Sequence, residues 1–259
     1  MLYSALEYIY DGTFDGLLCC LYAHVYEEAA QAILSETDAG QYGLAPRKKL
    51  ETRSREAGRV AAAIENKISR NCLRRCYRAF LSEEPEREMD ILAYVFYGFA
   101  KGKDVDLLHG DHIVRRIDVL NHKVNREVER MLGMLRFSLI RDTANRPVLY
   151  AHFAPDCDLV QLLMPHFLNR YRREPFIIHD VKREKAAFSA EGRWVMRPLP
   201  RDYSPEYTPD EEACRALWRR YFTNAAIQER VNPRGQKNFM PKRYWQHLVE
   251  NPEEKRPPV

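Results

Sequence analysis

Apolar residues recur at every third or fourth position over several stretches of the first 140 residues, a spacing typical of helices that bury one face. In one such stretch Ile64, Ile68, Cys72 and Cys76 repeat at four-residue intervals. Glycine or proline separates one stretch from the next. We therefore predict helices over residues 16–34, 52–81, 89–99 and 113–135. The N-terminal part of the chain is accordingly predicted to be mainly helical.

The pattern changes after Arg136, where short runs of β-branched and aromatic residues replace the helical spacing. Strands are predicted over residues 147–153, 176–181, 186–189 and 193–197, with a hairpin turn at 190–192. A helix bent at Pro165 is predicted over 158–171, between the first two strands. Further helices are predicted over 210–227 and 242–249, and the second of them begins next to Pro241.

These elements predict an α+β fold with a mainly helical N-terminal part, a small β-α-β-β unit and a helical C-terminal segment. The predicted domains are residues 1–140, which are mainly helical, and residues 141–250, an α+β part that ends in a basic motif. Residues 251–259 are predicted to form a flexible tail.

Composition then excludes two classes of protein. Of the 259 residues, 45% are hydrophobic and 11% are aromatic, which is too apolar for a disordered chain. The longest uncharged apolar run covers residues 91–100 and is too short to span a membrane. The first residues carry acids rather than the basic segment of a secretory signal. We therefore expect a cytoplasmic protein without a membrane partner.

The six cysteines form no CxxC pair, so their spacing does not favour a zinc ribbon or an iron–sulfur cluster. Cys72 and Cys76 lie four residues apart on the apolar face of a predicted helix. Buried thiols that act as small hydrophobic groups explain this spacing, and a cytoplasmic location disfavours disulfides. No cofactor is predicted.

Polar residues near the predicted strand ends suggest a site of another kind. They are His152, Asp156, His179 and Asp180. Imidazole and carboxylate groups together can hold a divalent ion. The chain has no HxH or HExxH spacing, however, and His179 with Asp180 can equally form a hydrogen-bonded pair at the end of a strand. Both interpretations stay open, and no GxSxG, P-loop or GxGxxG motif identifies a catalytic residue.

The net charge is only +4, but the positive excess lies in the C-terminal half. From Arg141 to the end of the chain the balance is +5. The chain contains 30 arginines and 11 lysines. Arginine suits bidentate contacts with phosphate, although the codon usage of a GC-rich genome explains the same bias equally well.

The most distinctive stretch, residues 230–245, contains no acid and interleaves bases with aromatic residues. Such a pattern suits a groove that follows the backbone of single-stranded or distorted nucleic acid. The candidate phosphate-binding residues are Arg230, Asn232, Arg234, Lys237, Lys242 and Arg243, together with Lys182 and Arg183 after a predicted strand. Tyr244 and Trp245 are candidates for stacking on bases. Alternatively, both aromatic residues belong to the core and the bases decorate a surface loop.

Three stretches resemble, in this order, a bacterial family of probable DNA metabolism proteins: YDGTFDGLL at 10–18, FIIHDVKREKA at 176–186 and RVNPRGQKNFMPKRYW at 230–245. The resemblance runs over nearly the whole chain. In that family the C-terminal domain, of unknown function, also occurs fused to uracil-DNA glycosylases of the family 4 type. Members are encoded beside a radical SAM protein with a helix-hairpin-helix element. The resemblance implies a role in DNA metabolism or repair and supplies no catalytic residue.

Together these observations favour a nucleic-acid-binding accessory protein that presents single-stranded or damaged DNA to a partner enzyme. The resemblance implies a partner of the radical SAM or uracil-DNA glycosylase type. One alternative is an enzyme that acts on DNA through a metal ion or a carboxylate. The other is a protein-interaction subunit for the radical SAM partner, without affinity for DNA.

Overall fold

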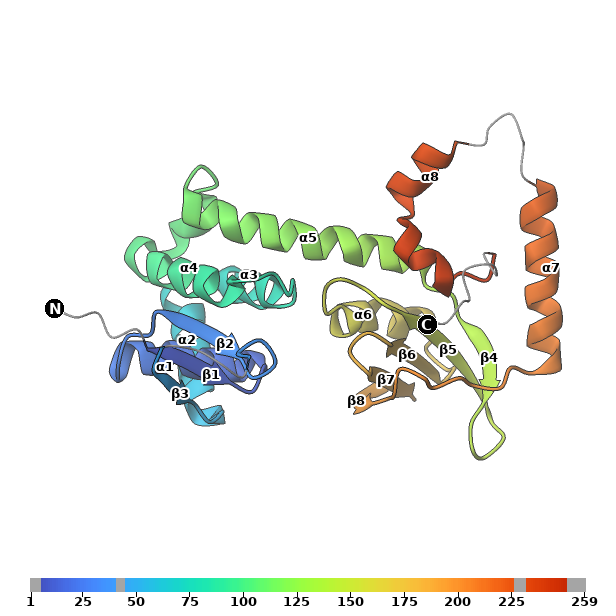
Figure 1. Cartoon of the computed structure of the whole chain (residues 1–259), viewed down its shortest axis with the longest axis horizontal. Helices are drawn as coiled ribbons and strands as arrows, with labels where there is room; N and C mark the ends of the chain where they lie inside the picture. The colour runs from blue at the N-terminus through green and yellow to red at the C-terminus, as the bar shows by residue number, and fades with distance from the viewer. Residues whose placement is uncertain (1–5, 41–44, 226–231, 251–259) are drawn as a thin grey trace. The chain divides into compact units, whose positions relative to one another are not determined.

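The chain divides into two units, residues 1–125 and 126–259, which are called the N-terminal and the C-terminal unit below. The computed structural model describes residues 6–40, 45–225 and 232–250 (Figure 1). Helix α5, His112–Met134, begins in the first unit and ends in the second. Among the described residues, no helix combines the length and the apolar character that crossing a membrane requires.

The N-terminal unit contains a small parallel sheet in the strand order β2-β1-β3. The strands are β1 Glu7–Tyr10, β2 Ala32–Ser35 and β3 Arg47–Lys49. The helices are α1 Phe14–Tyr26, α2 Ser54–Lys67, α3 Arg70–Phe80 and α4 Arg87–Lys101, followed by the 3-10 helix η1 Gly102–Leu107. Helix α1 connects β1 to β2 and packs on α2, so the apolar stripes of both helices become core.

Two of the predicted helices in this unit need correction. The prediction of one helix over 16–34 is wrong beyond Tyr26, because residues 32–35 pair with β1 as a strand. The predicted helix over 52–81 is two helices that break at Ile68. There Ser69 caps α3 by accepting a hydrogen bond from the backbone N–H of Cys72 at 2.8 Å. Cys72 and Cys76 are fully buried, as their spacing predicts, and none of the six cysteines forms a disulfide.

Residues 10–16, the first part of the YDGTFDGLL stretch, form the tight connection between β1 and α1. Gly12 has a positive φ of 78°, and Thr13 caps α1 by accepting a hydrogen bond from the Gly16 N–H at 3.0 Å. Asp11 accepts hydrogen bonds from the Thr13 N–H at 2.9 Å and from the Thr52 hydroxyl at 2.7 Å. These contacts make residues 10–16 a tight turn that leads into a capped helix.

Substituting alanine at two glycines should change stability in opposite directions. A Cβ on Gly16 would clash with Asp11 Oδ1 and would lie 2.9 Å from Thr52 Oγ1, so Gly16→Ala should destabilise the protein by about 1–3 kcal/mol. Gly58, in α2, has open space around it, so Gly58→Ala should stabilise by about 0.5–1 kcal/mol. Urea unfolding followed by circular dichroism measures the change in the free energy of unfolding for each variant. Equal effects at the two positions would contradict the close packing at Gly16.

The C-terminal unit is built on a five-stranded sheet in the order β4-β5-β6-β7-β8. The strands are β4 Ser138–Arg141, β5 Pro147–Phe153, β6 Phe176–Asp180, β7 Lys185–Ala190 and β8 Arg193–Pro198. Strands β5 and β6 are parallel and joined by helix α6, Val160–Arg170, while the other pairs are antiparallel. The predicted α+β fold is confirmed, and the predicted β-α-β-β unit corresponds to β5-α6-β6-β7, with the fourth predicted strand, β8, paired beside β7. Strand β4 was not predicted.

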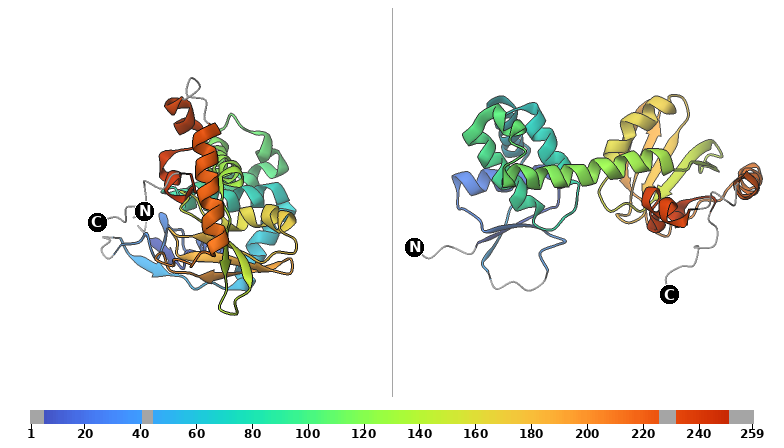
Figure 2. Two further views of the ribbon diagram at one scale, coloured as in Figure 1. Left: turned by 90° about the vertical axis from the view of Figure 1, so that its right-hand side faces the viewer. Right: turned by 90° about the horizontal axis from the view of Figure 1, so that it is seen from above.

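The two faces of this sheet have different covers. Helix α6 packs against β6 and β7 and buries Leu163, Met164 and Phe167 (Figures 1 and 2). On the opposite face, Ile140, Val148 and Tyr150 form a cluster with Leu199 and Tyr207, from the segment after β8. This second face is covered over β4 and β5 but becomes exposed toward β8, where Val195 is 52% exposed.

The C-terminal helices are α7 Pro209–Ala225, α8 Pro233–Phe239 and the 3-10 helix η3 Lys242–His247. Helix α7 corresponds to the helix predicted over 210–227, and η3 replaces the α-helix predicted over 242–249. Helix α8 was not predicted, because its glycine and asparagine are weak helix formers. The predicted tail, 251–259, lies outside the described residues.

Candidate nucleic-acid interface

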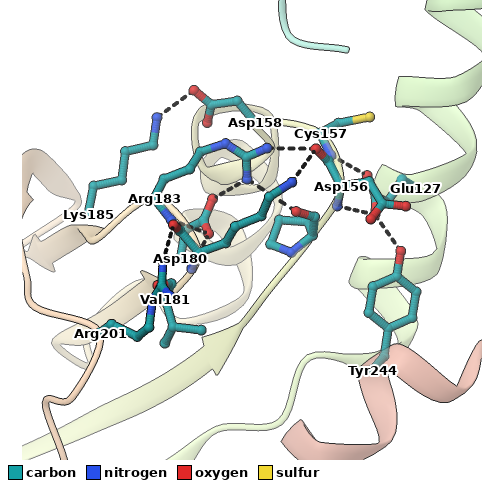
Figure 3. A network of polar contacts seen from close by, with 12 residues as sticks. Glu127, Asp156, Cys157, Asp158, Asp180, Val181, Arg183, Lys185, Arg201 and Tyr244 are labelled. Carbon is teal, nitrogen blue, oxygen red and sulfur yellow. Dashed lines mark hydrogen bonds and ion pairs between the residues drawn. The ribbon is translucent and has the colours of Figure 1, made fainter. Parts of the chain in front are cut away.

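The basic motif is fixed to the C-terminal unit by one buried tyrosine. Tyr244, on η3, is only 2% exposed, and its hydroxyl donates a hydrogen bond to the carboxylate of Glu127 on α5 (Figure 3). Burial and the neighbouring carboxylate raise the pKa of Tyr244, so the phenol remains protonated and donates. Because the Tyr244 ring is covered, no base can stack on it. The interpretation of Tyr244 as a core residue is the one the structure supports.

The contact between Tyr244 and Glu127 is called the first anchor below, and Glu127 is at its centre. Its carboxylate is buried, and it accepts hydrogen bonds from the backbone N–H groups of Asp156 and Cys157, both at 2.8 Å (Figure 3). Burial alone raises the pKa of Glu127, but the hydrogen bonds from Tyr244, Asp156 and Cys157 outweigh it, and the pKa lies below its ordinary value. Glu127 therefore joins α5, the loop after β5 and η3 as a buried anion.

Sequence reasoning did not identify Glu127, although the chain carries a signal for it. Buried positions along α5 follow one another at intervals of three or four residues: Ile117, Leu120, Val124, Glu127, Met131 and Met134. Glu127 therefore occupies an apolar position of the helix. A carboxylate at such a position needs hydrogen-bond donors from elsewhere in the fold, and this requirement marks it as a structural or functional group.

Two of the candidate phosphate-binding arginines are engaged within the unit. Arg243 forms an ion pair with Asp156 at 2.7 Å and donates to the Tyr244 hydroxyl at 2.9 Å. Arg183 is only 11% exposed and forms an ion pair of 2.7 Å with Asp180, whose side chain is fully buried. Its guanidinium also donates to the carbonyl oxygens of Pro155, at 3.2 Å, and Asp156, at 2.7 Å (Figure 3). Arg183 is thus a buried anchor rather than a phosphate-binding residue.

Arg183 and Asp180 form the second anchor, which joins the loop after β5 to the loop after β6. Asp180 ends β6, and it accepts hydrogen bonds from the backbone N–H groups of Lys182 at 3.1 Å and Arg183 at 3.2 Å. The Lys182 ammonium, which is exposed, donates to the carbonyl of Asp156 at 3.3 Å. Burial raises the pKa of Asp180, and Arg183 opposes this shift. Both loops therefore depend on Arg183 for their shape.

The two candidate histidines lie side by side on β5 and β6, since His152 and His179 are register partners. His179 Nε2 lies 3.2 Å from the Leu199 carbonyl, which can only accept, so Nε2 carries the proton and Nδ1 accepts from the Tyr150 hydroxyl at 2.8 Å. Burial lowers the pKa of His179, which keeps the ring neutral. These contacts give His179 a structural role.

A third histidine joins this cluster without having been predicted. The His247 ring, on η3, lies 5.0 Å from the His152 ring, and burial lowers its pKa to about 4. The carboxylates of Asp156 and Asp180 are instead paired with Arg243 and Arg183. Within the described part of the chain, no group of three or more histidine, cysteine or acidic side chains is arranged to hold a metal ion.

Four other residues of the motif are exposed and are together called the basic face below. They are Arg234, Lys237, Phe239 and Lys242. Arg234 and Lys237 lie one helical turn apart on α8, and Phe239 is 83% exposed. The guanidinium of Arg130, on α5, donates to the carbonyl of Asn238 at 3.3 Å and so connects α8 to the same helix as Glu127.

The other candidates support this surface. Asn232 caps α8 by accepting a hydrogen bond from the Gly235 N–H at 2.9 Å. Trp245 is partly buried, its indole N–H donates to the Met240 carbonyl at 2.8 Å, and the Lys242 ammonium lies 5.7 Å from its ring centre. Arg230 lies outside the described residues. The motif therefore turns Tyr244 inward and leaves Arg234, Lys237, Lys242 and Phe239 outward, while Arg243 stays half exposed in its ion pair with Asp156.

Comparison with known proteins relates this architecture to a family without an assigned activity. No curated protein matches the chain. A family model, described as a domain of unknown function, DUF4130, matches residues 85–250. The matched range contains both anchors, the sheet of the C-terminal unit and the basic face. The chain therefore belongs to the DUF4130 family of domains of unknown function.

Proposed function

We propose that the protein is a nucleic-acid-binding accessory protein of DNA metabolism or repair. The observation that carries this proposal is the basic face, where Arg234, Lys237, Lys242 and Phe239 are all exposed on a segment anchored to buried Glu127. An anchored backbone holds these cations at fixed spacing, which suits a chain of phosphates better than mobile cations would. Phe239 adds an apolar surface on which a base can stack.

The wider role in this proposal comes from the family resemblance of the sequence. That resemblance favours DNA as the nucleic acid and a radical SAM or uracil-DNA glycosylase type enzyme as the partner. The protein would then hold single-stranded or damaged DNA for the partner. The positive balance of +5 after Arg141 supports the same assignment, because phosphate contacts contribute most of sequence-independent affinity.

Removing the basic face should weaken DNA binding on any sequence. In the triple variant Arg234→Ala/Lys237→Ala/Lys242→Ala, we expect the affinity for DNA to fall at least about tenfold and the slope of log K against log salt to fall by about 3. Fluorescence anisotropy with labelled single-stranded, duplex and uracil-containing DNA at several salt concentrations measures both quantities.

A charge-matched variant controls for the loss of three positive charges. Arg55→Ala/Lys103→Ala/Arg115→Ala removes three exposed cations from the N-terminal unit and should leave the salt slope unchanged. An equal loss of affinity in both triple variants would exclude the basic face as the binding surface. Absence of DNA binding by the intact protein would overturn the proposed function.

A second candidate function, a protein-interaction subunit, is favoured by helix α7. None of its residues is buried, and the exposed apolar side chains are Leu217, Trp218, Tyr221 and Phe222. An exposed apolar stripe of this kind is typical of a surface that another protein covers. Stable complex formation with the radical SAM partner, without any affinity for DNA, would favour this function over the first.

A further inference from the structure

A groove opens on the face of the C-terminal sheet that α6 does not cover. Its volume is about 580 Å³, within the range of ligand sites in proteins. Ile177, Phe188, Val195 and Tyr203 line it, together with residues of the β4–β5 and β7–β8 hairpins. None of these residues belongs to the basic motif or to the two anchors.

Strand register explains why this part of the sheet is apolar. Tyr150, Ile177, Phe188 and Val195 are successive partners across β5, β6, β7 and β8, so their side chains form one row on one face. Tyr150 is buried beneath the segment after β8, and its ring meets the Tyr203 ring edge-on at 5.6 Å. Toward β8 that cover ends, which leaves Phe188 partly exposed and Val195 open to solvent.

The rim of the groove is basic on two sides. Arg141 and Arg146 stand on the β4–β5 hairpin, and Arg193 stands at the start of β8. Asp142 is the only acid in the lining described here, and it pairs with Arg146 at 2.7 Å. The lining thus combines three guanidinium groups and one carboxylate with an apolar and aromatic floor. Such a surface complements a ligand with planar apolar rings and negative charges at its edges.

We propose that this groove binds unpaired nucleobases of a single-stranded nucleic acid, with flanking phosphates at Arg141, Arg146 and Arg193. The inference rests on the proposed function and extends it from a phosphate-binding surface to a preference for single strands. Bases of a duplex are stacked on one another and cannot enter a groove in a sheet, whereas unpaired bases can turn outward onto Phe188 and Tyr203.

A single substitution at the open end of the groove tests this proposal. Val195→Glu places a carboxylate on the floor, where it repels phosphate and removes the apolar contact. Because Val195 is 52% exposed, the fold should tolerate the change. We expect the affinity for a labelled oligothymidylate to fall about tenfold, the loss of roughly one stacked base, while the affinity for a duplex of equal length changes little.

A matched control carries the same substitution at similar exposure outside the groove. Val119, on α5, is 57% exposed, so Val119→Glu should leave both affinities unchanged. A second groove variant, Arg141→Ala/Arg146→Ala, alters only exposed side chains. It should lower the salt slope for single strands by about 2.

The outcomes separate this inference from the proposed function. If single strands bind with a steep salt slope but Val195→Glu binds as tightly as the wild type, the groove is excluded while the basic face remains. If the intact protein binds no nucleic acid, both proposals fail. If Val195→Glu instead breaks a dimer detected by sedimentation, the groove is an interface between two copies of the chain and the nucleobase assignment is overturned.

Discussion

Glu127→Ala should lower the free energy of unfolding of the C-terminal unit by about 3–5 kcal/mol, because each buried donor left without an acceptor costs roughly 1–3 kcal/mol. Three donors lose their partner at once, namely the N–H groups of Asp156 and Cys157 and the hydroxyl of Tyr244. The same change should release η3 from α5 and so weaken DNA binding through the basic face.

The contribution of Glu127 depends on pH in a predictable direction. Its pKa in the folded protein lies below the ordinary value of 4.5, so the folded state favours the ionised carboxylate. The resulting stability is fully present above pH 4.5 and is lost as the pH falls through the folded pKa. The difference in stability between wild type and Glu127→Gln should therefore be constant at neutral pH and shrink below pH 4.5.

Urea unfolding followed by tryptophan fluorescence at several pH values measures both effects. Glu129→Ala is the matched control, since Glu129 lies on the same helix with an exposed side chain. It should change the free energy of unfolding by no more than about 0.5 kcal/mol. Equal stability of Glu127→Ala and Glu129→Ala would contradict a buried, hydrogen-bonded Glu127.

Arg183→Ala should destabilise the C-terminal unit by a similar amount, about 3–5 kcal/mol, because it leaves a buried carboxylate without its counter-charge. Asp180 is fully buried, and burial raises its pKa because the carboxylate loses its hydration there. The loss also removes the hydrogen bonds to the carbonyls of Pro155 and Asp156, which shape the loop after β5.

Chemical denaturation of three variants tests this second anchor. Arg183→Lys should recover only part of the stability, since a single ammonium cannot reproduce the fork of a guanidinium. Arg173→Ala, at an exposed position, should remain within about 0.5 kcal/mol of the wild type. If Arg183→Ala unfolds like Arg173→Ala, Arg183 does not neutralise Asp180 in solution.

The sequence predicts an element well when a local pattern, such as an apolar run bounded by turn residues, is enough to specify it. Residues 147–153 and 176–180 are short apolar runs bounded by proline, glutamate or aspartate, and the hairpin at 190–192 has Glu191 and Gly192 at positive φ. The strands that sequence missed, β1 to β4, are only three or four residues long. A strand of that length shows no clear alternation, and its existence depends on partners far away in the chain.

Single residues of the candidate site also depend on distant partners, which the sequence does not show. The basic motif is visible in the sequence because its charge is local, and Arg234, Lys237 and Lys242 are exposed. Arg183 has the same chemistry, but Asp180 holds it inside the unit, and Arg243 is half exposed in an ion pair with Asp156. Which arginine faces solvent is decided by tertiary contacts, and a linear pattern contains no record of those contacts.

The distribution of the thiols makes the native protein suited to site-selective labelling. Cys214, on α7, is exposed, whereas the other five cysteines are buried. Burial also raises the pKa of Cys19, and that of Cys20 to about 12, while a hydrogen bond with Cys72 and then burial raise the pKa of Cys76. These shifts suppress the reactive thiolate. A maleimide dye should therefore attach to α7 without prior mutagenesis. A fluorophore at that position would report directly on the helix whose aromatic side chains are candidates for contact with a partner protein.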